Sequence, residues 1–304
     1  MDPLLKQLLE IPSESYDCDR MWKFLSDYAD NNGWSWRSDE IGNLYVQKGT
    51  LPEGAHYPCL VAHIDTVHRI EPGGIRAIEI DGKVTGINPL SMEQTGIGGD
   101  DKCGIYAALF CLHRLDYCKA AFFVDEEVGC IGSRSADITF FKNCRYVLQA
   151  DRRGYGDFVT DISGPLSSKA FQTAIKPATE LFGYKACQGM MTDVEALRDA
   201  KVGISVANFS AAYYNPHSPD EYIVIHELLA VCAMFLQICE DVTEQFKFTA
   251  PKRRSYFRTG GKVIDLRKGN DPYKGFYDDD EMWERYMMGR AKELQDPGGK
   301  AFPD

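Results

Sequence analysis

The chain has 304 residues, of which 44% are hydrophobic and 26% are charged, a composition typical of a globular protein. Its formal net charge of -11 argues against nucleic acid as the main partner. No hydrophobic run approaches the roughly 20 residues of a membrane span, and the start of the chain lacks the pattern of a secretory signal. We therefore expect no membrane partner.

The ten cysteines indicate a reducing compartment. None of them forms a Cys-x-x-Cys pair, and several lie inside hydrophobic runs, as Cys111 and Cys232 do. Free cysteines of this kind are usually buried and are typical of intracellular proteins. We expect a cytoplasmic protein without a disulfide framework.

Two helices and two strands are predicted in the first 64 residues. Asp2 and Pro3 are typical of a helix start, and leucines follow at helical spacing. A second helix is predicted over residues 19–31. Strands are predicted over residues 43–47 and 57–64, and the second of these carries His63 at its end.

Strands and helices alternate through the next 175 or so residues. A glycine-rich loop at 96–99 precedes Asp100-Asp101 and a helix at 104–115. Strands at 119–124 and 145–150 lead to Glu126-Glu127 and to Asp151. A helix at 193–199, a strand at 202–206 and a helix at 225–239 follow. This alternation predicts an α/β fold, a three-layer α/β/α sandwich around a mostly parallel mixed sheet.

The segment 251–304 differs from the rest of the chain. It holds 12 Lys/Arg and 10 Asp/Glu, a net charge of +2, whereas the remainder has 22 minus 35, or -13. We predict a C-terminal extension, partly disordered, which is either solvated or a partner-binding or self-association arm. Helical spacing predicts one amphipathic helix formed by Trp283, Tyr286, Met287, Ala291 and Leu294.

Acidic and imidazole side chains follow most of the predicted strands. Two adjacent carboxylates such as Glu126-Glu127 at a buried strand end are costly unless cations or hydrogen bonds neutralise them. Taken singly, each group has an ordinary explanation: a solvated turn, a helix N-terminus, a pairing with a neighbouring arginine, or an exposed loop histidine. Their joint occurrence at strand ends favours a metal site, because such ends gather in one crevice. The set is His63, Asp65, Asp100-Asp101, Glu126-Glu127, Asp151 and His217.

With this set of residues, the sequence resembles the co-catalytic dizinc exopeptidases, the clan of peptidase T, the aminoacylases and the single-domain zinc aminopeptidases. The resemblance covers about residues 1–245, which we take as the catalytic domain, and it implies the zinc-exopeptidase type of fold. The matching motifs are Val61-Ala62-His63-Ile64-Asp65-Thr66-Val67, Gly99-Asp100-Asp101-Lys102-Cys103-Gly104, Asp125-Glu126-Glu127-Val128-Gly129, Ala150-Asp151 and Asn215-Pro216-His217, with weaker matches that include Met191-Thr192-Asp193.

The resemblance implies a role for each residue. His63 with Asp151 would hold one metal ion, and Glu127 with His217 would hold the other. Asp100 would bridge the two ions, and the peptide bond between it and Asp101 is expected to be cis. The choice of Asp100 over Asp101 rests on the family pattern alone. Asp65 would accept a hydrogen bond from His63. Glu126 would act as the general base in a mechanism that uses a metal-bound hydroxide.

We further expect the preceding strand to separate the two glutamates, because adjacent residues of a strand point to opposite sides. Relatives with a lid insert about a hundred residues between the third carboxylate and the last histidine. Here Asp151 and His217 are 66 positions apart, which predicts that the lid domain is absent. The weaker candidates for substrate contacts are Arg152, Arg153, Tyr213 and Tyr214.

The function predicted on this basis is a metallopeptidase, an aminopeptidase acting on short peptides. Its cofactors would be two divalent ions, zinc with cobalt or manganese as alternatives, and its partners would be a short peptide or amide substrate and a second copy in a homo-oligomer. One alternative is an N-acyl amino acid amidohydrolase of the same clan. The other is a non-catalytic, metal-stabilised binding module that acts through its C-terminal tail.

Overall fold

The computed structural model describes residues 1–251, 256–259 and 262–265. The chain forms two compact units, Met1–Pro251 and Lys252–Asp304. In the second unit, β14 (Tyr256–Thr259) and β15 (Lys262–Asp265) pair as an antiparallel hairpin that the sequence analysis did not predict. The amphipathic helix predicted around Trp283 lies outside the described residues.

The first unit is built on an eight-stranded mixed sheet. Its central strands β7, β3, β8 and β11 run parallel, whereas β2 and β1 are antiparallel additions at one edge. At the other edge β9 is antiparallel to β11, and β10 is parallel to β9. In spatial order the strands are β1 (Ser35–Ser38), β2 (Leu44–Lys48), β7 (Cys118–Phe123), β3 (Tyr57–His63), β8 (Cys144–Ala150), β11 (Val206–Phe209), β9 (Asp157–Asp161) and β10 (Lys185–Gln188).

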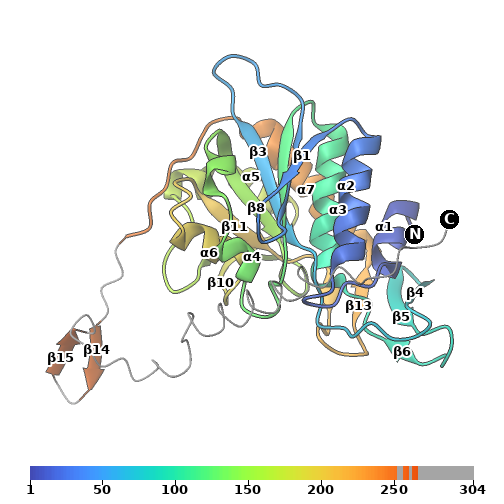
Figure 1. The fold of residues 1–304 in the computed structure, drawn as a ribbon. Helices are drawn as coiled ribbons and strands as arrows, with labels where there is room; N and C mark the ends of the chain where they lie inside the picture. The colour runs from blue at the N-terminus through green and yellow to red at the C-terminus, as the bar shows by residue number, and fades with distance from the viewer. Residues whose placement is uncertain (252–255, 260–261, 266–304) are drawn as a thin grey trace. The chain divides into compact units, whose positions relative to one another are not determined.

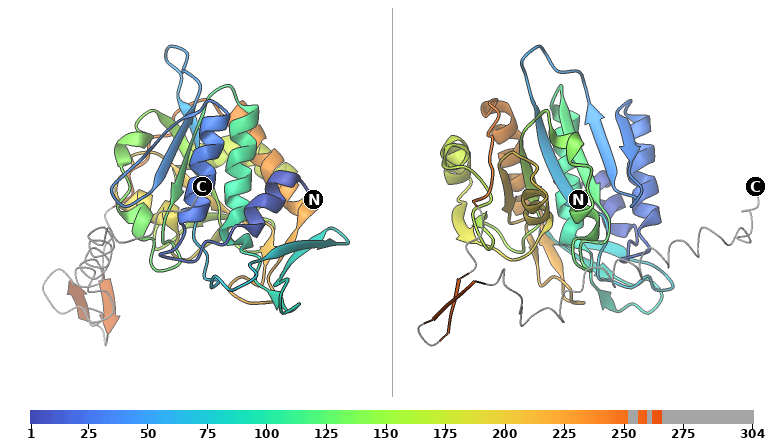
Figure 2. Two further views of the ribbon diagram at one scale, coloured as in Figure 1. Left: turned by 45° about the vertical axis from the view of Figure 1, so that its right-hand side comes forward. Right: turned by 60° about the vertical axis from the view of Figure 1, so that its left-hand side comes forward.

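Helices cover both faces of this sheet, which confirms the predicted sandwich (Figures 1 and 2). One face carries a row of neighbouring helices: α2 (Asp19–Asn31), α3 (Gly99–Arg114), α7 (Ile225–Asp241) and α5 (Lys169–Leu181), with α1 (Pro3–Glu10) against α3. The other face carries α6 (Asp193–Asp199), with α4 (Ile131–Arg134) against it, and the short 3-10 helix η1 (Ile138–Phe141).

The core lies on both sides of the central strands. Every residue of β3, β7 and β8 is buried, as expected for strands covered on both faces. Toward α6 and η1, the side chains of Val61, Phe123, Phe141 and Leu197 belong to one hydrophobic cluster. The long hydrophobic runs of the sequence therefore build a rigid frame whose strand ends carry the polar motifs.

A second, smaller sheet was not predicted. Its strands pair in the order β12 (Tyr213–Tyr214), β13 (Tyr222–Val224), β5 (Lys83–Ile87) and β4 (Arg76–Ile80), and β6 (Gln94–Thr95) pairs with β5. This sheet lies near the N-terminal end of α3 (Figure 1). It brings residues 76–95 and 213–224 together beside the predicted metal ligands.

The predicted elements agree with the structure at most positions, with two corrections. The strand expected over 202–206 is β11 at Val206–Phe209, because Val202 still donates to the Leu197 carbonyl and Gly203 has a φ of 83° in the turn after α6. Helix α3 begins at Gly99 rather than 104, with non-helical backbone at Asp100 and Asp101.

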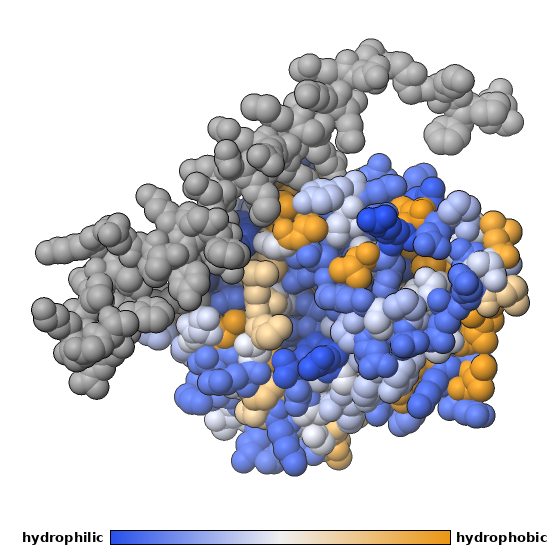
Figure 3. Space-filling view, turned by 90° about the horizontal axis from the view of Figure 1, so that it is seen from below, coloured by the Kyte–Doolittle hydropathy of each residue, from blue (hydrophilic) through white to orange (hydrophobic). Residues whose placement is uncertain are grey.

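The ten cysteines are free, and only Cys187 among them is more than slightly exposed. Within the described ranges, no helix combines the length and hydrophobicity that a bilayer crossing requires. Hydrophilic residues cover most of the face viewed from below, with hydrophobic ones scattered among them (Figure 3).

Candidate metal centre

The register of the sheet explains how distant motifs meet. His63 lies opposite Phe123 in the pairing of β3 with β7, Val61 lies opposite Gln149 in β8, and Ala150 lies opposite Phe209 in β11. These parallel strands therefore end at about the same level. The residues that end or follow them, from His63 to Asp151, are delivered to a single edge of the sheet.

Three of the predicted ligands converge at the end of β3. The His63 Nε2 atom lies 3.2 Å from Asp100 Oδ1 and 3.7 Å from Asp151 Oδ1. Their donor atoms all lie within 4.8 Å of one another, a spacing that a single metal ion can bridge. The His63 side chain is fully buried. The first predicted set is thus assembled without any contribution from the chain beyond residue 151.

A second group forms on the other side of Asp100. The His217 Nε2 atom lies 3.2 Å from Asp100 Oδ2 and 3.0 Å from Glu127 Oε2. His217 comes from the loop between β12 and β13, where its φ is 62°. Asp100 therefore presents one carboxylate oxygen to each histidine, which is the arrangement that a bridging ligand requires.

The structure separates Asp100 from Asp101, which the sequence alone did not. The Asp101 carboxylate is buried and accepts hydrogen bonds from the backbone N–H groups of His63 and Gly104, at 3.3 and 3.0 Å. The peptide bond between the two aspartates is cis, as expected. Only Asp100 faces the two histidines.

The expectation that strand alternation separates Glu126 from Glu127 is wrong. Strand β7 ends at Phe123, and Asp125 has a φ of 55°, so both glutamates lie in the turn beyond the strand. Asp65 fixes that turn instead. Its Oδ1 accepts from the Glu126 N–H at 2.9 Å and its Oδ2 from the Glu127 N–H at 3.3 Å.

Asp65 also contacts His63, though mainly through its backbone. The His63 Nδ1 atom lies 3.0 Å from the Asp65 carbonyl oxygen and 3.4 Å from its Oδ1. Burial alone would raise the pKa of Asp65, but hydrogen bonds from His63, the Ser15 hydroxyl and the Glu126 N–H lower it. Asp65 is therefore a fixed negative charge that positions both His63 and the glutamate turn.

The two glutamates have different surroundings. Glu127 contacts His217 in the second group, whereas Glu126 belongs to neither triad, and its Oε2 lies 3.9 Å from His63 Nε2. Burial raises the pKa of Glu126 well above its usual range. A carboxyl group with a raised pKa beside a metal site is suited to transfer a proton.

The carboxylates of this centre favour positive charge on the two histidines. Hydrogen bonds with Asp100 and Glu127 raise the pKa of His217 to about 10. Burial would lower the pKa of His63, yet its contacts with Asp100, Asp151 and Asp65 raise it well above the usual range. Burial and the charge of Asp100 raise the pKa of Asp151 to about 6. These contacts therefore favour the protonated, positively charged form of both histidines.

The donors of this centre fit two zinc-like ions. Imidazole nitrogen and carboxylate oxygen are ordinary zinc ligands, and three protein ligands with an open position are typical of a catalytic ion. The Glu127 Oε1 atom is buried and has no hydrogen-bond partner. A buried carboxylate oxygen without a partner is costly, and a bound ion would remove that cost.

Several supporting residues were missed by the sequence analysis. Glu221, which is buried, accepts from the backbone N–H groups of Gly98 and Asp100 at 2.8 and 3.1 Å and pairs with His68. Thr192 donates to Asp151 Oδ2 at 2.7 Å, and Gln149 donates to the same oxygen at 3.1 Å. These isolated residues carry no motif; only the weak match at 191–193 pointed to this region.

The four candidates for substrate contacts have separate environments. Tyr213 is buried, and its hydroxyl donates to Asp151 Oδ1 at 3.2 Å. Tyr214 instead donates to Glu227 and stacks on Tyr222. The Arg152 guanidinium pairs with Asp157 at 2.9 Å, a surface pairing. Arg153 is exposed and, within the described residues, forms no hydrogen bond or ion pair.

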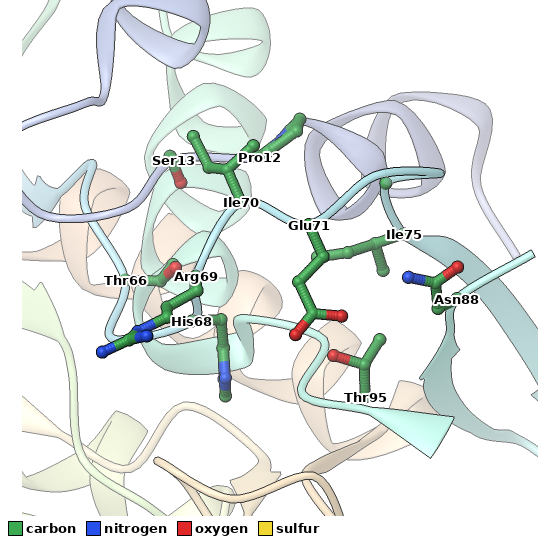
Figure 4. Close-up of a pocket in the computed structure, with 11 residues that line it drawn as sticks. Pro12, Ser13, Thr66, His68, Arg69, Ile70, Glu71, Ile75, Asn88 and Thr95 are labelled. Carbon is green, nitrogen blue, oxygen red and sulfur yellow. The ribbon is translucent and has the colours of Figure 1, made fainter. Parts of the chain in front are cut away.

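A small cavity lies behind the loop that follows β3 (Figure 4). Its volume is about 10 Å³, and Ser13, Thr66, His68, Glu71 and Thr95 are among its lining residues. The buried Ser13 hydroxyl has no hydrogen-bond partner. This space suits one water molecule and is too small for a peptide, so the cavity is not the substrate site.

No separate lid domain interrupts the interval between Asp151 and His217. Residues in that interval form β9, β10 and β11 of the main sheet, helices α5 and α6, and β12 of the second sheet. Every element of the interval thus belongs to the body of the first unit.

No family model and no curated protein matches the sequence. Solved structures do. Aminopeptidase PepT from Bacillus cereus is similar with a TM-score of 0.67 and 16% identity, over 79% of this chain and 97% of that chain. A tripeptidase from Staphylococcus aureus is similar with a TM-score of 0.65 and 14% identity, over 78% of this chain and 96% of that chain. The aminopeptidase APDkam598 from Desulfurococcus kamchatkensis has a TM-score of 0.60 and 16% identity, over 79% of this chain and 94% of that chain.

At these identities the similarity establishes the fold. Besides these, the matched structures include the TET1 peptidase of Pyrococcus horikoshii and a TET aminopeptidase from a marine sediment archaeon. The chain therefore shares the fold of these peptidase structures.

Proposed function

We propose that this protein is a metal-dependent exopeptidase, an aminopeptidase that acts on short peptides. The observation that carries the proposal is the pair of ligand groups that share Asp100, one with His63 and Asp151 and the other with Glu127 and His217. The printed descriptions of the similar structures, an aminopeptidase and a tripeptidase among them, support the same reaction class.

In this proposal, each group would hold one divalent ion, zinc with cobalt or manganese as alternatives, and Asp100 would be common to both groups. When bound, the ions supply the Lewis acidity that lowers the pKa of water from about 15.7 toward about 7 and polarises the scissile carbonyl. Asp65 holds His63 and the glutamate turn in position through the contacts described above.

Glu126 is proposed as the general base. Its carboxylate accepts the proton of the attacking water and then returns that proton to the leaving amine. Two features support the assignment: Glu126 lies beside His63 without belonging to either ligand triad, and its burial favours the protonated form that must donate. Glu127, one residue later, is proposed as a ligand and not as a base.

The direct test compares Glu126→Gln with the unchanged protein after loading with zinc. General-base catalysis contributes about 10²–10⁴-fold, so hydrolysis of di- and tripeptides is expected to fall at least about 100-fold while the bound metal stays the same. Glu244→Gln is the matched control, because Glu244 is exposed. Full activity in Glu126→Gln, or full activity after removal of all metal, contradicts the proposal.

The same assay distinguishes the alternatives. An aminopeptidase requires a free amino terminus, so N-acylated substrates are expected to be inert. Turnover of blocked substrates alone identifies an N-acyl amino acid amidohydrolase. Correctly folded, metal-loaded protein that turns over neither kind of amide supports the binding module acting through residues 251–304.

Two further expectations belong to the whole protein. The TET1 peptidase of Pyrococcus horikoshii is described as assembling into a tetrahedron or a large octahedral shell, and we propose that this chain also self-associates. Light scattering that gives only the 34.2 kDa monomer mass contradicts this.

The cytoplasmic location stays a prediction from cysteine usage, tested by fractionation of cells.

A further inference from the structure

A third group of possible ligands lies next to the two triads. It consists of Glu126, Cys130 and Asp193, whose donor atoms lie within 4.8 Å of one another. The Cys130 Sγ atom lies 3.3 Å from Glu126 Oε1. Cys130 and Asp193 are fully buried. Of the three residues, only Glu126 has a role in the proposed reaction.

Asp193 gives an independent sign that this group is incomplete. Its Oδ2 atom accepts a hydrogen bond from Gln149 Nε2 at 3.0 Å. Its Oδ1 atom is buried and has no partner at hydrogen-bond geometry, because the nearby Ser133 hydroxyl donates to the Cys130 carbonyl oxygen at 3.3 Å. A carboxylate oxygen that has lost water without gaining a partner is costly in a protein interior. The group therefore contains a side chain that is available to a ligand.

The acidic side chains of this group lack a basic partner. Glu126 and Asp193 place two carboxyl groups beside Cys130, and a bound cation would offset their negative charge. Within the described part of the chain, no lysine or arginine forms an ion pair with either of them.

The donors suit a soft divalent ion. Zinc binds thiolate sulfur at about 2.3 Å and carboxylate oxygen at about 2.0–2.2 Å, so a sulfur and an oxygen in a tetrahedral site lie roughly 3.5–3.7 Å apart. The Cys130–Glu126 distance is 3.3 Å, so a shift of a few tenths of an ångström (about 0.2–0.4 Å) would admit the ion. A thiolate among the ligands selects zinc and cadmium over magnesium or calcium.

We propose that Glu126, Cys130 and Asp193 form a third, inhibitory site for zinc or cadmium ions. Binding replaces the thiol proton of Cys130, which is released to solvent, by a metal–sulfur bond. It also ties up the Glu126 carboxylate, so that this group can no longer accept a proton. The inhibition, though not the binding itself, rests on the proposed peptidase function.

The test is a cadmium titration of the full-length protein whose two triads are already loaded with zinc. A cadmium–thiolate bond gives an ultraviolet charge-transfer band, which reports Cys130 independently of catalysis. We expect the band to grow with about one added equivalent while peptide hydrolysis falls in parallel. In Cys130→Ala the band is lost, and the cadmium concentration for half inhibition, relative to that variant's own rate without cadmium, rises at least about tenfold.

Cys187→Ser is the matched control, because Cys187 is the more exposed cysteine and lies on β10; this variant should keep both the band and the inhibition. Asp193→Asn, checked for folding by its Tm, should weaken cadmium binding and serves if Cys130→Ala does not fold. A band or inhibition that is unchanged in Cys130→Ala, or an active enzyme that shows no band, overturns the proposal. A Cys130-dependent band in a protein that hydrolyses no peptide upholds the site and removes the proposed function instead.

Discussion

Glu126 and Glu127 are adjacent in the chain, yet their side chains have different partners. Asp65 accepts hydrogen bonds from both backbone N–H groups and so fixes the turn that carries them. Glu127 is thereby placed against His217, whereas Glu126 lies near His63 and Cys130. The division of roles proposed for the pair thus depends on a third carboxylate, Asp65, which lies 61 positions before Glu126.

Arg153 is the residue for which a substrate contact is most readily tested. It follows Asp151 by two positions, is exposed, and has no protein partner in the described part of the chain. An arginine of this kind can bind the carboxylate of a short peptide. In Arg153→Ala we expect KM for dipeptides to rise about tenfold, the equivalent of 1.4 kcal/mol, with little change for aminoacyl amides, which lack that carboxylate.

Arg152→Ala is the control, because the Arg152 side chain already pairs with Asp157. Equal effects of Arg153→Ala on dipeptides and on aminoacyl amides, measured as kcat and KM separately, would show that Arg153 does not recognise the carboxyl terminus.

At the scale of elements, the carboxyl ends of the parallel strands explain why much of the site was predictable. His63, the glutamate pair and Asp151 each end or follow a buried hydrophobic run. Because parallel strands end at the same edge of a sheet, short motifs far apart in the sequence are enough to indicate one site. The same runs predicted the three layers.

Other elements gave no such signal. Strands β4 and β5 are mostly exposed or half-buried, so they lack a continuous hydrophobic run. Helix α5 contains Pro177, which weakens a helical pattern. Glu221 acts on Asp100 from 121 positions away, and Asp193 meets Cys130 only after folding. A single polar residue whose partners are distant in sequence cannot be distinguished from an ordinary surface residue.

The close packing of α3 against the end of β8 leads to a prediction for Gly104. A Cβ atom at this position would lie 2.7 Å from the Ala150 carbonyl oxygen and would also clash with the Asp101 carboxylate. Gly104→Ala should therefore displace the start of α3, with a loss of about 1–3 kcal/mol in unfolding free energy. Denaturant unfolding measures this loss. An unchanged midpoint would show that the contact between α3 and β8 is not tight.

At the scale of the whole molecule, one continuous body supplies all the proposed ligands. His217 comes from the loop between two strands of the second sheet and Asp100 from the start of α3, whereas His63, Glu127 and Asp151 end or follow strands of the first. Metal binding should therefore join the two sheets and stabilise the unit Met1–Pro251 as a whole. The hairpin β14–β15 belongs to the other unit and contributes no proposed ligand.

Thermal unfolding tests this coupling. A ligand that binds only the folded state at a free concentration 100 times its Kd stabilises by about 2.7 kcal/mol, so zinc is expected to raise the Tm of the apoprotein by at least about 5 °C. His217→Ala should lose part of that increase, whereas His226→Ala, at an exposed position, should keep it. An identical increase in both variants would mean that zinc binds elsewhere.

The central claim is that two metal ions share Asp100. The most direct measurement is anomalous scattering from crystals of the zinc-loaded protein. We predict two peaks about 3.5–4 Å apart, one bounded by His63, Asp151 and Asp100 and the other by His217, Glu127 and Asp100. A single peak, or peaks that do not contact Asp100, would contradict the account.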